Sequence, residues 1–441
     1  MTSRPWSESL RGPAGALGTE HAPAYLPIDR AFALVNDYGT GRALLWRGPA
    51  PAEANEVATL WRRAAEAPRP HRVAPEEVVE GYGVFTFPYG PISMGVPESG
   101  RFDVRTYGER ILTLGPVAGF KSRRILGALP GLTPEDALLR VERLAGNFSA
   151  AHAAAFLAAV ESAAAIEVAR TELWTRALAQ ELERIYNHLH QIARVAEAAS
   201  QNVGLAQTHA LAEEMLRIEG RTFGHRWLFG ALAPGAPTRR LDPEGRRWLG
   251  RALRELSGRF EVLLELFLGS RTFVDRLQTT GVVSRERAVR WGAVGPVLRA
   301  TGVAWDDRLR APSVPYTDLF LELPREDGGD ALARILVRAH EVRSSALLLE
   351  QLLDRWPGDA MAREAPAPPV GPGRGLGRVE SPSGDLVYEV RLTNGRIASV
   401  GMRSASHANW PVFAESLRHA VFTDFHFAWE SFGLVFAETD A

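Results

Sequence analysis

Four side chains in the middle of the chain could carry protons, because two are imidazoles and two are carboxyls. Groups of these types exchange protons near neutral pH when burial or a neighbouring charge shifts their pKa. Several of them along helical segments would form a polar relay. The candidate relay consists of His152, Glu161, Glu181 and His188.

A structural interpretation competes with this relay. Buried histidines are usually hydrogen-bonded rather than catalytic, and for His152 we favour the structural role. The carboxyls of Glu161 and Glu181, with that of Glu183, would form ion pairs inside a helix bundle, and for them both interpretations stay open. The arginines that would pair with them are Arg143, Arg170 and Arg184.

Composition removes several other classes of chemistry. The 441 residues include no cysteine, which excludes disulfides, iron–sulfur ligation and a catalytic thiol on this chain. There are 51 Lys and Arg against 52 Asp and Glu, and this balance does not suit a nucleic-acid binder. P-loop, dinucleotide-binding, zinc-protease and serine-hydrolase motifs are not found either, so nothing predicts NAD binding by this chain itself.

Other conspicuous residues are given structural roles. His188 and His190 would point about 200° apart on a helix, so they cannot share a metal ion, and we interpret both as surface or interface histidines. The alternating glycines between 371 and 377 are interpreted as a flexible approach to a hairpin. Trp410 and Trp429 are expected to anchor a core or an interface rather than stack on a cofactor.

Apolar residues recur every three or four positions over several long segments, which predicts amphipathic helices. The clearest segment covers residues 170–198. Thr133 followed by Pro134 is typical of a helix start, because threonine caps the first turn and proline fits the first helical position. Further helices are predicted over about 206–230, 243–268, 284–299, 330–356 and 408–420.

Short β elements flank the helical region. Alternating residues over 101–107 and 110–114, separated by Gly108, predict a hairpin. A second hairpin is predicted around Asn394-Gly395, because this dipeptide suits a tight turn with positive φ. The Pro- and Gly-rich residues 364–374 are predicted to form an extended linker.

Residues 143–152, Arg-Leu-Ala-Gly-Asn-Phe-Ser-Ala-Ala-His, resemble the first metal motif of NiFe-hydrogenase large subunits, R-x-C-G-x-C-x-x-x-H. The segment 181–189 and the pair Asp307-Arg308 also match that family. The loops at 88–91 and 97–102 resemble those of the energy-converting membrane hydrogenases. Formate hydrogenlyase belongs to that group, and the quinone-site subunit of respiratory complex I is related to it. The resemblance covers residues 80–441.

The departures from the family concern its metal site. In hydrogenases, four thiolates hold nickel and iron, two from the first motif and two from the C-terminal end. The resemblance places Ala145, Phe148, Val435 and Glu438 at these positions. One hard carboxylate cannot replace four soft thiolates, so we expect no metal centre on this chain. The three apolar side chains are expected to fill the space by close packing.

Complex I subunits lack the same cysteines, and the resemblance implies a quinone site in which a histidine, a tyrosine and an aspartate hold the head group. Here those positions fall on Ser93, Pro134 and Asn202, and a second family histidine falls on Ser122. Serine and asparagine form hydrogen bonds but are poor acids near neutral pH. Ser93, Ser122 and Asn202 are therefore candidates to line an acceptor cavity, with quinone chemistry in doubt.

Two acids and three arginines in the matching segments are predicted to form buried bridges between lobes, because arginine suits bidentate pairing. These residues are Asp307, Asp330, Arg308, Arg334 and Arg338.

The predicted fold is mainly α (α+β), a hydrogenase-large-subunit-like helical bundle with small flanking β elements. We divide it into four parts. The first is a segment that could be a remnant or a replacement of the small α/β domain fused in front of some relatives, and the second holds the bundle. The linker and a closing C-terminal hairpin, helix and tail follow. Their ranges are 1–80, 81–363, 364–374 and 375–441.

The resemblance implies a subunit of a membrane-bound, complex I-like oxidoreductase related to energy-converting hydrogenases. Such a subunit would bind an iron–sulfur small subunit and antiporter-like membrane subunits, with the cluster, and any NAD, on partners. A quinone is one candidate acceptor. The sequence predicts no membrane span or export signal, and hence a cytoplasmic chain held at the inner face of the membrane by its partners. The alternative is a non-catalytic scaffold or regulatory protein that keeps only the fold.

Overall fold

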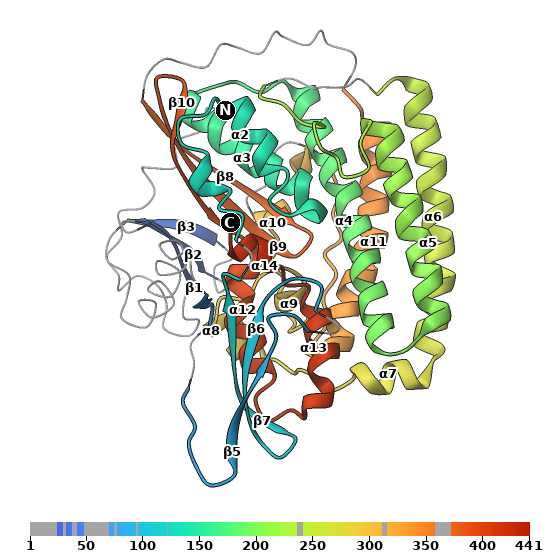
Figure 1. The fold of residues 1–441 in the computed structure, drawn as a ribbon. Helices are drawn as coiled ribbons and strands as arrows, with labels where there is room; N and C mark the ends of the chain where they lie inside the picture. The colour runs from blue at the N-terminus through green and yellow to red at the C-terminus, as the bar shows by residue number, and fades with distance from the viewer. Residues whose placement is uncertain are drawn as a thin grey trace.

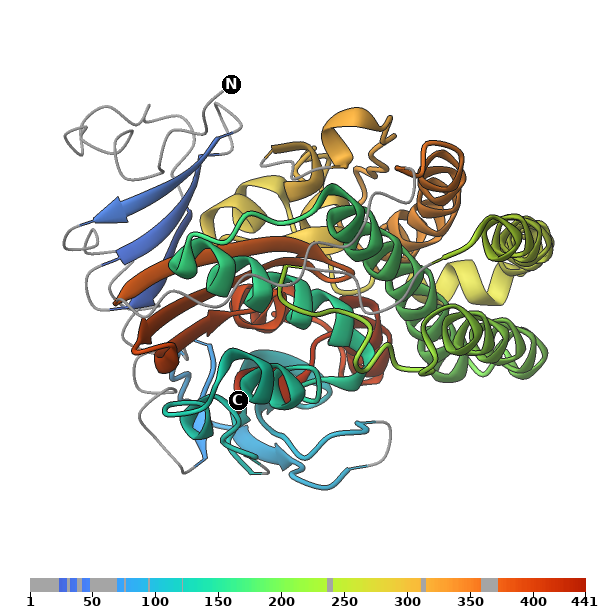
Figure 2. The same cartoon turned by 90° about the horizontal axis from the view of Figure 1, so that it is seen from above.

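The computed structural model describes residues 24–29, 32–37, 42–47, 70–74, 77–93, 96–120, 122–235, 241–310, 315–357 and 372–441. A bundle of long helices forms one side of the molecule, and two antiparallel sheets with the C-terminal helices form the other (Figures 1 and 2). The predicted α+β class is confirmed.

Four long helices make the bundle. Helix α4 packs against α5 and α11, and α6 covers α5 and α11 from the outside (Figure 1). Three of these helices carry apolar stripes at the predicted spacing. Helices α6 and α11 begin at capping aspartates: the Asp242 carboxylate accepts from Gly245 N at 2.6 Å, and the Asp330 carboxylate accepts from Ala333 N at 2.8 Å. The bounds are α4 (Arg170–Ala198), α5 (Asn202–Phe223), α6 (Pro243–Gly269) and α11 (Ala331–Asp354).

A three-stranded sheet lies beside the bundle, with the Ala-rich helix α3 packed on it. The strands follow the order β10-β9-β8, and the Asn394-Gly395 turn joins β9 to β10 as predicted. The bounds are α3 (Ser149–Ala164), β8 (Gly373–Ser381), β9 (Gly384–Thr393) and β10 (Arg396–Arg403).

The interpretation of the alternating glycines as a flexible approach was wrong for those in the described part of the chain. Gly373, Gly375 and Gly377 lie in β8, and each faces the backbone of α3. A Cβ atom would lie 2.0 Å from Ala155 O at Gly377 and 2.1 Å from Ala159 O at Gly375. The glycines are therefore needed for close packing of a strand on a helix, because no side chain fits between the two backbones.

The second sheet has four strands in the order β4-β7-β6-β5, and it includes the predicted hairpin. The C-terminal helices cover its inner face with an aromatic core, in which the Trp410 and Trp429 rings stack with centroids 5.6 Å apart. Both are buried, as predicted. The bounds are β4 (His71–Arg72), β5 (Val84–Tyr89), β6 (Arg101–Tyr107), β7 (Arg110–Ala118), α12 (Ala405–Ser416), α13 (Phe425–Phe432) and α14 (Phe436–Thr439).

Shorter elements connect these layers. Near the N-terminus, three strands form a separate antiparallel sheet in the order β1-β2-β3. The remaining bounds are β1 (Ala24–Asp29), β2 (Phe32–Asp37), β3 (Arg42–Arg47), α2 (Pro134–Val141), α7 (Arg271–Leu277), α8 (Arg285–Arg290), α9 (Gly295–Arg299) and α10 (Asp307–Arg310).

Helix boundaries differ from the predictions where glycine intervenes. The single helix predicted over 284–299 is two helices, α8 and α9, because Gly292 (φ 69°), between them, and Gly295 (φ 64°), at the start of α9, adopt left-handed conformations. Likewise, α5 ends before Gly224 (φ 88°) instead of continuing to 230. The helix predicted over 408–420 begins and ends earlier, at 405 and 416. Residues 364–371 of the predicted linker lie outside the described residues.

None of the helices in the described part of the chain combines the length and apolar character that a bilayer span requires.

Replacing Gly377 by alanine should disrupt the packing of β8 on α3. The added methyl group would overlap a backbone carbonyl, which cannot rotate away, so we expect a loss of roughly 3 kcal/mol in the free energy of unfolding. Urea unfolding followed by circular dichroism measures this. The control is Gly258→Ala in α6, where nothing lies within 4 Å of the new Cβ, and which should stabilise the helix by up to about 1 kcal/mol. Equal stabilities of the two variants would contradict this packing.

Candidate functional site

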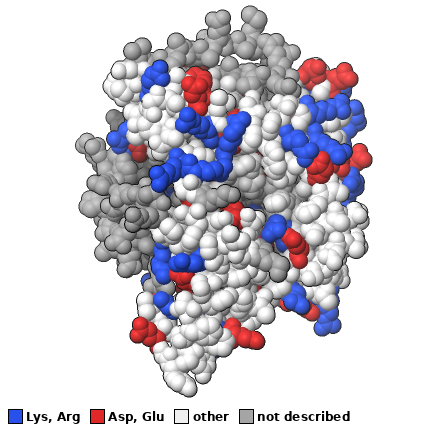
Figure 3. Space-filling model, in the orientation of Figure 1, with Lys and Arg blue, Asp and Glu red and all other residues white. Residues whose placement is uncertain are grey.

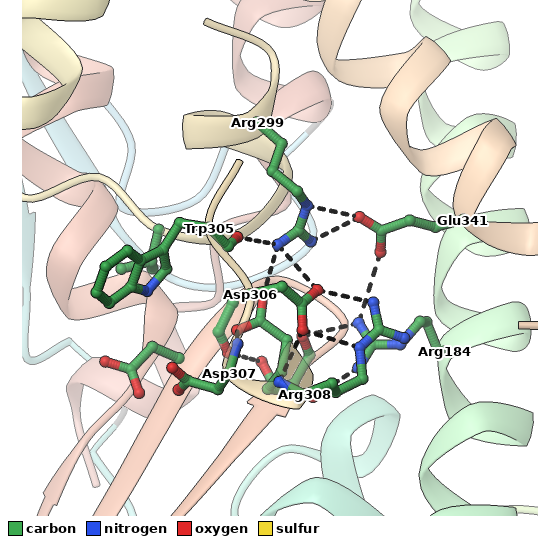
Figure 4. A network of polar contacts seen from close by, with 12 residues as sticks. Arg184, Arg299, Trp305, Asp306, Asp307, Arg308 and Glu341 are labelled. Atoms are coloured by element: carbon green, nitrogen blue, oxygen red, sulfur yellow. Dashed lines mark hydrogen bonds and ion pairs between the residues drawn. The ribbon is translucent and has the colours of Figure 1, made fainter. Parts of the chain in front are cut away.

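Many charged side chains in the described part of the chain are buried. On the face shown in Figure 3, broad uncharged areas separate the visible charges. The densest buried group lies where α4, α11, β8 and the α9–α10 segment meet (Figure 4). At its centre is Arg299, whose side chain is fully buried. Its guanidinium is 2.6 Å from Glu341, 2.8 Å from Glu380 and 3.2 Å from Asp306.

A second arginine continues this network towards α4. The Arg308 guanidinium contacts Asp306 at 2.8 Å and both Glu181 carboxylate oxygens at 3.1 Å. Glu181 also accepts hydrogen bonds from Tyr316 Oη at 2.7 Å and Ser345 Oγ at 2.6 Å. Burial would raise the pKa of Glu181, but the neighbouring arginines and hydroxyls outweigh it and hold that pKa below its usual range.

Arg184 and His188 complete the network from the same face of α4. Arg184 lies 3.4 Å from Glu181 and 3.5 Å from Glu341, and it donates to the carbonyls of 380 and 381. His188 Nε2 lies 2.8 Å from Glu341, while Nδ1 faces the Arg338 guanidinium at 3.3 Å. Since arginine only donates, Nδ1 accepts and Nε2–H donates to Glu341. His188 is thus a neutral, buried histidine.

This result corrects the interpretation of His188 as a surface or interface residue. Burial lowers its pKa to about 4, because the imidazolium would be desolvated. His190 is partly exposed and stacks on Tyr186, with ring centroids 6.0 Å apart. The two histidines do point to different sides of α4, as the helical geometry requires.

The first motif and the C-terminal end, which are far apart in the sequence, meet in space. Ala145 and Phe148 are buried, and Val435 packs against their cluster together with Met402 and Ala441. The predicted apolar filling of this region is confirmed. The fourth position is occupied by Glu438, which is also buried.

Glu438 is paired with the histidine of the first motif. Its Oε1 lies 3.3 Å from His152 Nε2, and its Oε2 accepts from Ser406 Oγ at 2.5 Å. On the other side of the imidazole, Nδ1 lies 2.8 Å from Tyr388 Oη. All four side chains are buried. Burial would raise the pKa of Glu438, but the contacts with His152 and Ser406 outweigh it and lower that pKa.

This donor set does not fit a nickel–iron centre. Where the family has four thiolates, the chain offers two apolar side chains from one segment and a valine and a carboxylate from the other. The carboxylate is already engaged by an imidazole and a hydroxyl. Within the described residues, no group of three His, Asp or Glu side chains is placed to hold a metal ion.

The candidate relay residues divide between separate groups. Glu181 and His188 contact the network around Arg299, through Arg308 and Glu341 respectively, whereas His152 belongs to the Glu438 pair. Glu161 forms a bidentate pair with Arg176, at 2.6 and 2.7 Å, and accepts from Gly235 N at 2.9 Å.

Most of the predicted ion-pair partners were wrong. Of Arg143, Arg170 and Arg184, Arg184 contacts Glu181. Arg143 instead contacts Glu142 and lies over the ring of Phe229, and Arg170 pairs with Asp318. Sequence spacing could not identify the pairs Arg170–Asp318 and Arg176–Glu161, because in each of them the partners come from different elements.

The prediction of a buried ion pair is confirmed for Arg308, but its carboxylate partners differ from the predicted ones. Arg308 pairs with Asp306 and Glu181, while Asp307 pairs with Arg378 at 2.5 Å. The Asp330 carboxylate caps α11 and does not pair with an arginine of this set. Two of the predicted arginines mainly donate to backbone carbonyls and a hydroxyl: Arg334 and Arg338.

The candidate cavity residues have separate surroundings. Ser122 Oγ donates to Asp440 O at 2.6 Å, which attaches its loop to the C-terminal end. Asn202 is exposed at the start of α5, next to residues that contact α7. Ser93 follows β5 and its hydroxyl oxygen is buried. The structure thus gives no contact that joins these three side chains.

Sequence reasoning missed several members of the network, including Arg299, Asp306, Glu341 and Glu380. One signal was available for Glu341. It follows Arg334 and Arg338 at intervals of four and three, so the three side chains share one face of α11. No local pattern marks Arg299, because its partners come from three other elements.

Comparisons with known proteins place this fold in a family. Residues 205–370 match the model of the 49-kDa subunit of respiratory-chain NADH dehydrogenase. An NADH-quinone oxidoreductase subunit from Roseiflexus sp. is 30% identical, and the match covers 65% of this chain and 80% of that protein. The carbon monoxide-induced hydrogenase of Rhodospirillum rubrum is 28% identical, over 74% of this chain and 91% of that protein.

A solved structure shows the same fold. A chain of the membrane-bound sulfane sulfur reductase, an archaeal respiratory membrane complex, superposes with a TM-score of 0.77 at 23% identity, over 82% of this chain and 100% of that chain. The fold and the substituted ligand positions define a large subunit of the hydrogenase type without its metal ligands. The chain belongs to the family that unites NiFe-hydrogenase large subunits with the quinone-site (49-kDa) subunits of respiratory complex I. Related members include subunits of complex I-like and energy-converting hydrogenase complexes.

Replacing Arg299 by leucine should strongly destabilise the chain. Three buried carboxylates would lose their shared cation, and we expect a cost of about 3–5 kcal/mol in urea unfolding. The control Arg254→Leu removes an exposed pair with Glu350 and should cost less than about 1 kcal/mol. A similar small cost for both variants would show that the network does not hold the elements together.

Proposed function

We propose that this chain is a subunit of a membrane-bound, complex I-like assembly related to energy-converting hydrogenases, and that it has no nickel–iron centre of its own. An iron–sulfur cluster on a small partner subunit would deliver electrons. The chain would couple this transfer to reduction of an acceptor, with quinone as a candidate, or to ion movement through antiporter-like membrane subunits. It would lie on the cytoplasmic face, held by these partners.

One observation carries this proposal. The positions that hold the metal in hydrogenases are filled by Ala145, Phe148 and Val435, while the surrounding protein keeps a dense network of paired, buried charges. The metal-ligand positions are lost, but the buried charge network around them is kept. This combination favours a subunit that still has to bind its partner subunits. The relatives named as membrane-bound hydrogenase and NADH-quinone oxidoreductase subunits support the same class of partner.

The residues of this chain could hold and transfer protons, whereas a partner subunit would deliver the electrons. His152 lies between the Glu438 carboxylate and the Tyr388 hydroxyl, so the histidine of the first motif contacts the carboxylate that occupies one of the family's thiolate positions. A histidine with a carboxylate on one nitrogen and a phenol on the other can pass a proton through its ring. Quinone binding by Ser93, Ser122 and Asn202 has no such geometric support and depends on partner surfaces.

Purification of the tagged chain from its native membranes in mild detergent tests this function. Mass spectrometry should identify a small iron–sulfur subunit and polytopic, antiporter-like subunits in constant ratio to the chain. Elemental analysis of the same sample should show iron, with nickel far below one atom per complex.

Two outcomes would contradict the proposal. A chain recovered alone from the soluble fraction would favour the alternative, a scaffold or regulatory protein that keeps only the fold. Stoichiometric nickel would contradict the absence of a metal centre. A control purification from untagged cells identifies proteins that bind the resin.

A further inference from the structure

Exposed arginines gather on the surface around α2 and the loop that precedes it. In the upper half of Figure 3, blue side chains lie close together over the region where Figure 1 shows α2 and α3. We call the group the arginine patch. All of its members are exposed, and they are Arg123, Arg124, Arg140, Arg143 and Arg396.

Backbone carbonyls hold several of these guanidiniums in place. Arg140 donates to Ala128 O at 2.8 Å and Arg396 donates to Gly131 O at 2.9 Å, so side chains from two elements hold the loop before α2. Arg123 donates to two backbone carbonyls at the start of the first motif, one of them at 2.8 Å. Such bonds orient a guanidinium but leave its charge in place, because a carbonyl oxygen carries no net charge.

Few carboxylates balance the patch. Arg143 lies 3.3 Å from the buried Glu142, whereas the other four arginines form no ion pair within the described residues. Several exposed arginines elsewhere do have carboxylate partners, as Arg217 has in Glu213 at 3.0 Å. The patch therefore presents positive charge that the described part of the chain does not neutralise.

The exposed acids of α2 lie at the other end of that helix. Glu135 and Asp136 belong to its first turn, while Arg140 lies in its last turn and Arg143 follows it. The acids also complement the positive end of the helix dipole, which places them away from the arginines.

Arg124 also has an uncommon backbone conformation. Its φ angle is 50°, in the left-handed region that residues with a Cβ atom disfavour. Its guanidinium contacts neither a carboxylate nor a carbonyl in the described structure. The backbone is thus held in an unfavourable conformation while the charged side chain stays available to another molecule, a combination that is common at binding sites.

The patch lies beside the substituted metal positions. Ile125 and Leu126, which follow Arg124, pack against the cluster of Ala145 and Phe148. The same loop is attached to the C-terminal end, since Ser122 Oγ donates to the carbonyl of residue 440 at 2.6 Å. A molecule bound to the patch would therefore lie next to the region where the family holds its metal.

The surroundings of the patch favour an acidic protein surface as its occupant. Guanidiniums fixed by carbonyls suit carboxylates, which they bind in defined geometry, and Leu139, next to Arg140, is 53% exposed and adds an apolar contact. A nucleic acid does not suit a chain with a net charge of −1. A lipid surface would engage larger apolar side chains, and exposed ones such as Tyr82 and Phe85 belong to β5 and the turn before it, at the lower end of Figure 1.

We propose that the arginine patch binds an acidic surface of the iron–sulfur small subunit, beside the substituted metal positions. The inference rests on the proposed function and deepens it by naming the surface that receives this partner. Complementary charges would speed the encounter of the two subunits and fix their orientation. The electron donor would thereby face the same region as in relatives that keep the metal, although the ligands are gone.

Carbodiimide cross-linking of the purified assembly tests this contact. The reagent joins an amine to a carboxyl at ion-pair distance, and the sequence contains a single lysine, Lys121, so the background is small. Arg124→Lys and Arg140→Lys each keep the positive charge and add one amine to the patch. Each variant should give a link to an Asp or Glu of the small subunit that the wild-type chain does not give, and mass spectrometry identifies both linked residues.

The matched control is Arg217→Lys, because Arg217 is an exposed arginine on α5 with a carboxylate partner of its own. Its new amine should link to Glu213 within the chain, which shows that the reagent works, and not to the small subunit. The proposal is overturned if neither patch variant links to the small subunit, or if the control links to it equally. Links from the patch to a second copy of this chain would also overturn it.

Charge reversal measures the electrostatic part of the contact. The double variant Arg124→Glu/Arg140→Glu should lower the recovery of the small subunit about tenfold, because like charges would then face each other. Recovery with the wild-type chain should fall as added salt screens the contact, and Arg217→Glu should behave like the wild type. Unchanged recovery with the double variant would contradict the proposal. Circular dichroism checks that the variants fold, and if the double variant does not, the lysine variants still decide.

Binding by the isolated full chain separates this inference from the proposed function. With a fluorescent polyglutamate peptide as the probe, anisotropy should show salt-sensitive binding that Arg124→Glu/Arg140→Glu abolishes and Arg217→Glu retains. If no partner subunits are recovered from native membranes, the proposed function fails, whereas the peptide still decides whether the patch recognises carboxylates. Flotation with phosphatidylglycerol vesicles is the last comparison. Vesicle binding that the same double variant abolishes would identify a lipid surface and overturn the acidic protein partner.

Discussion

The pairing of buried arginines with acids is the constraint on which this structure depends. An unpaired guanidinium or carboxylate in a dry interior costs several kcal/mol, so each buried arginine needs acids or carbonyls at fixed places. Arg299 contacts three carboxyls from α11, the α9–α10 segment and β8, and Arg308 extends these contacts to Glu181 on α4. The helical bundle and the β8–β10 sheet are therefore positioned by the same few atoms. Such a network also limits which elements can shift relative to one another, because any movement would separate charges.

Close packing is the second constraint, and it explains how the protein keeps a hydrogenase fold without the metal ligands. Apolar side chains now join the first motif to the C-terminal end, where covalent metal–thiolate bonds join them in the family. The Ala-rich surface of α3 meets the glycines of β8 so closely that a methyl group has no space. The apolar cluster and the His152–Glu438 pair together join the first motif to the C-terminal end.

Buried polar groups also lie next to the apolar closure. His152 lies between a carboxylate and a phenol, and the first turn of α3, which includes His152, binds the Glu183 carboxyl. A helix N-terminus and an imidazole are both groups that accept or stabilise charge as a proton moves.

The sequence by itself determined the elements. The 3.6-residue periodicity defined α4 and α6 nearly to the residue, the Asn394-Gly395 dipeptide defined the β9–β10 turn, and the ordered motifs defined the family. These signals depend on residues that are close in sequence, so they can be recognised without the structure. The pairing of Arg299 with three separate elements, the burial of His188 and the meeting of Glu438 with His152 were decided by the tertiary structure alone. The energy of a buried charge depends on groups that are distant in sequence, and no local pattern records which of them will meet.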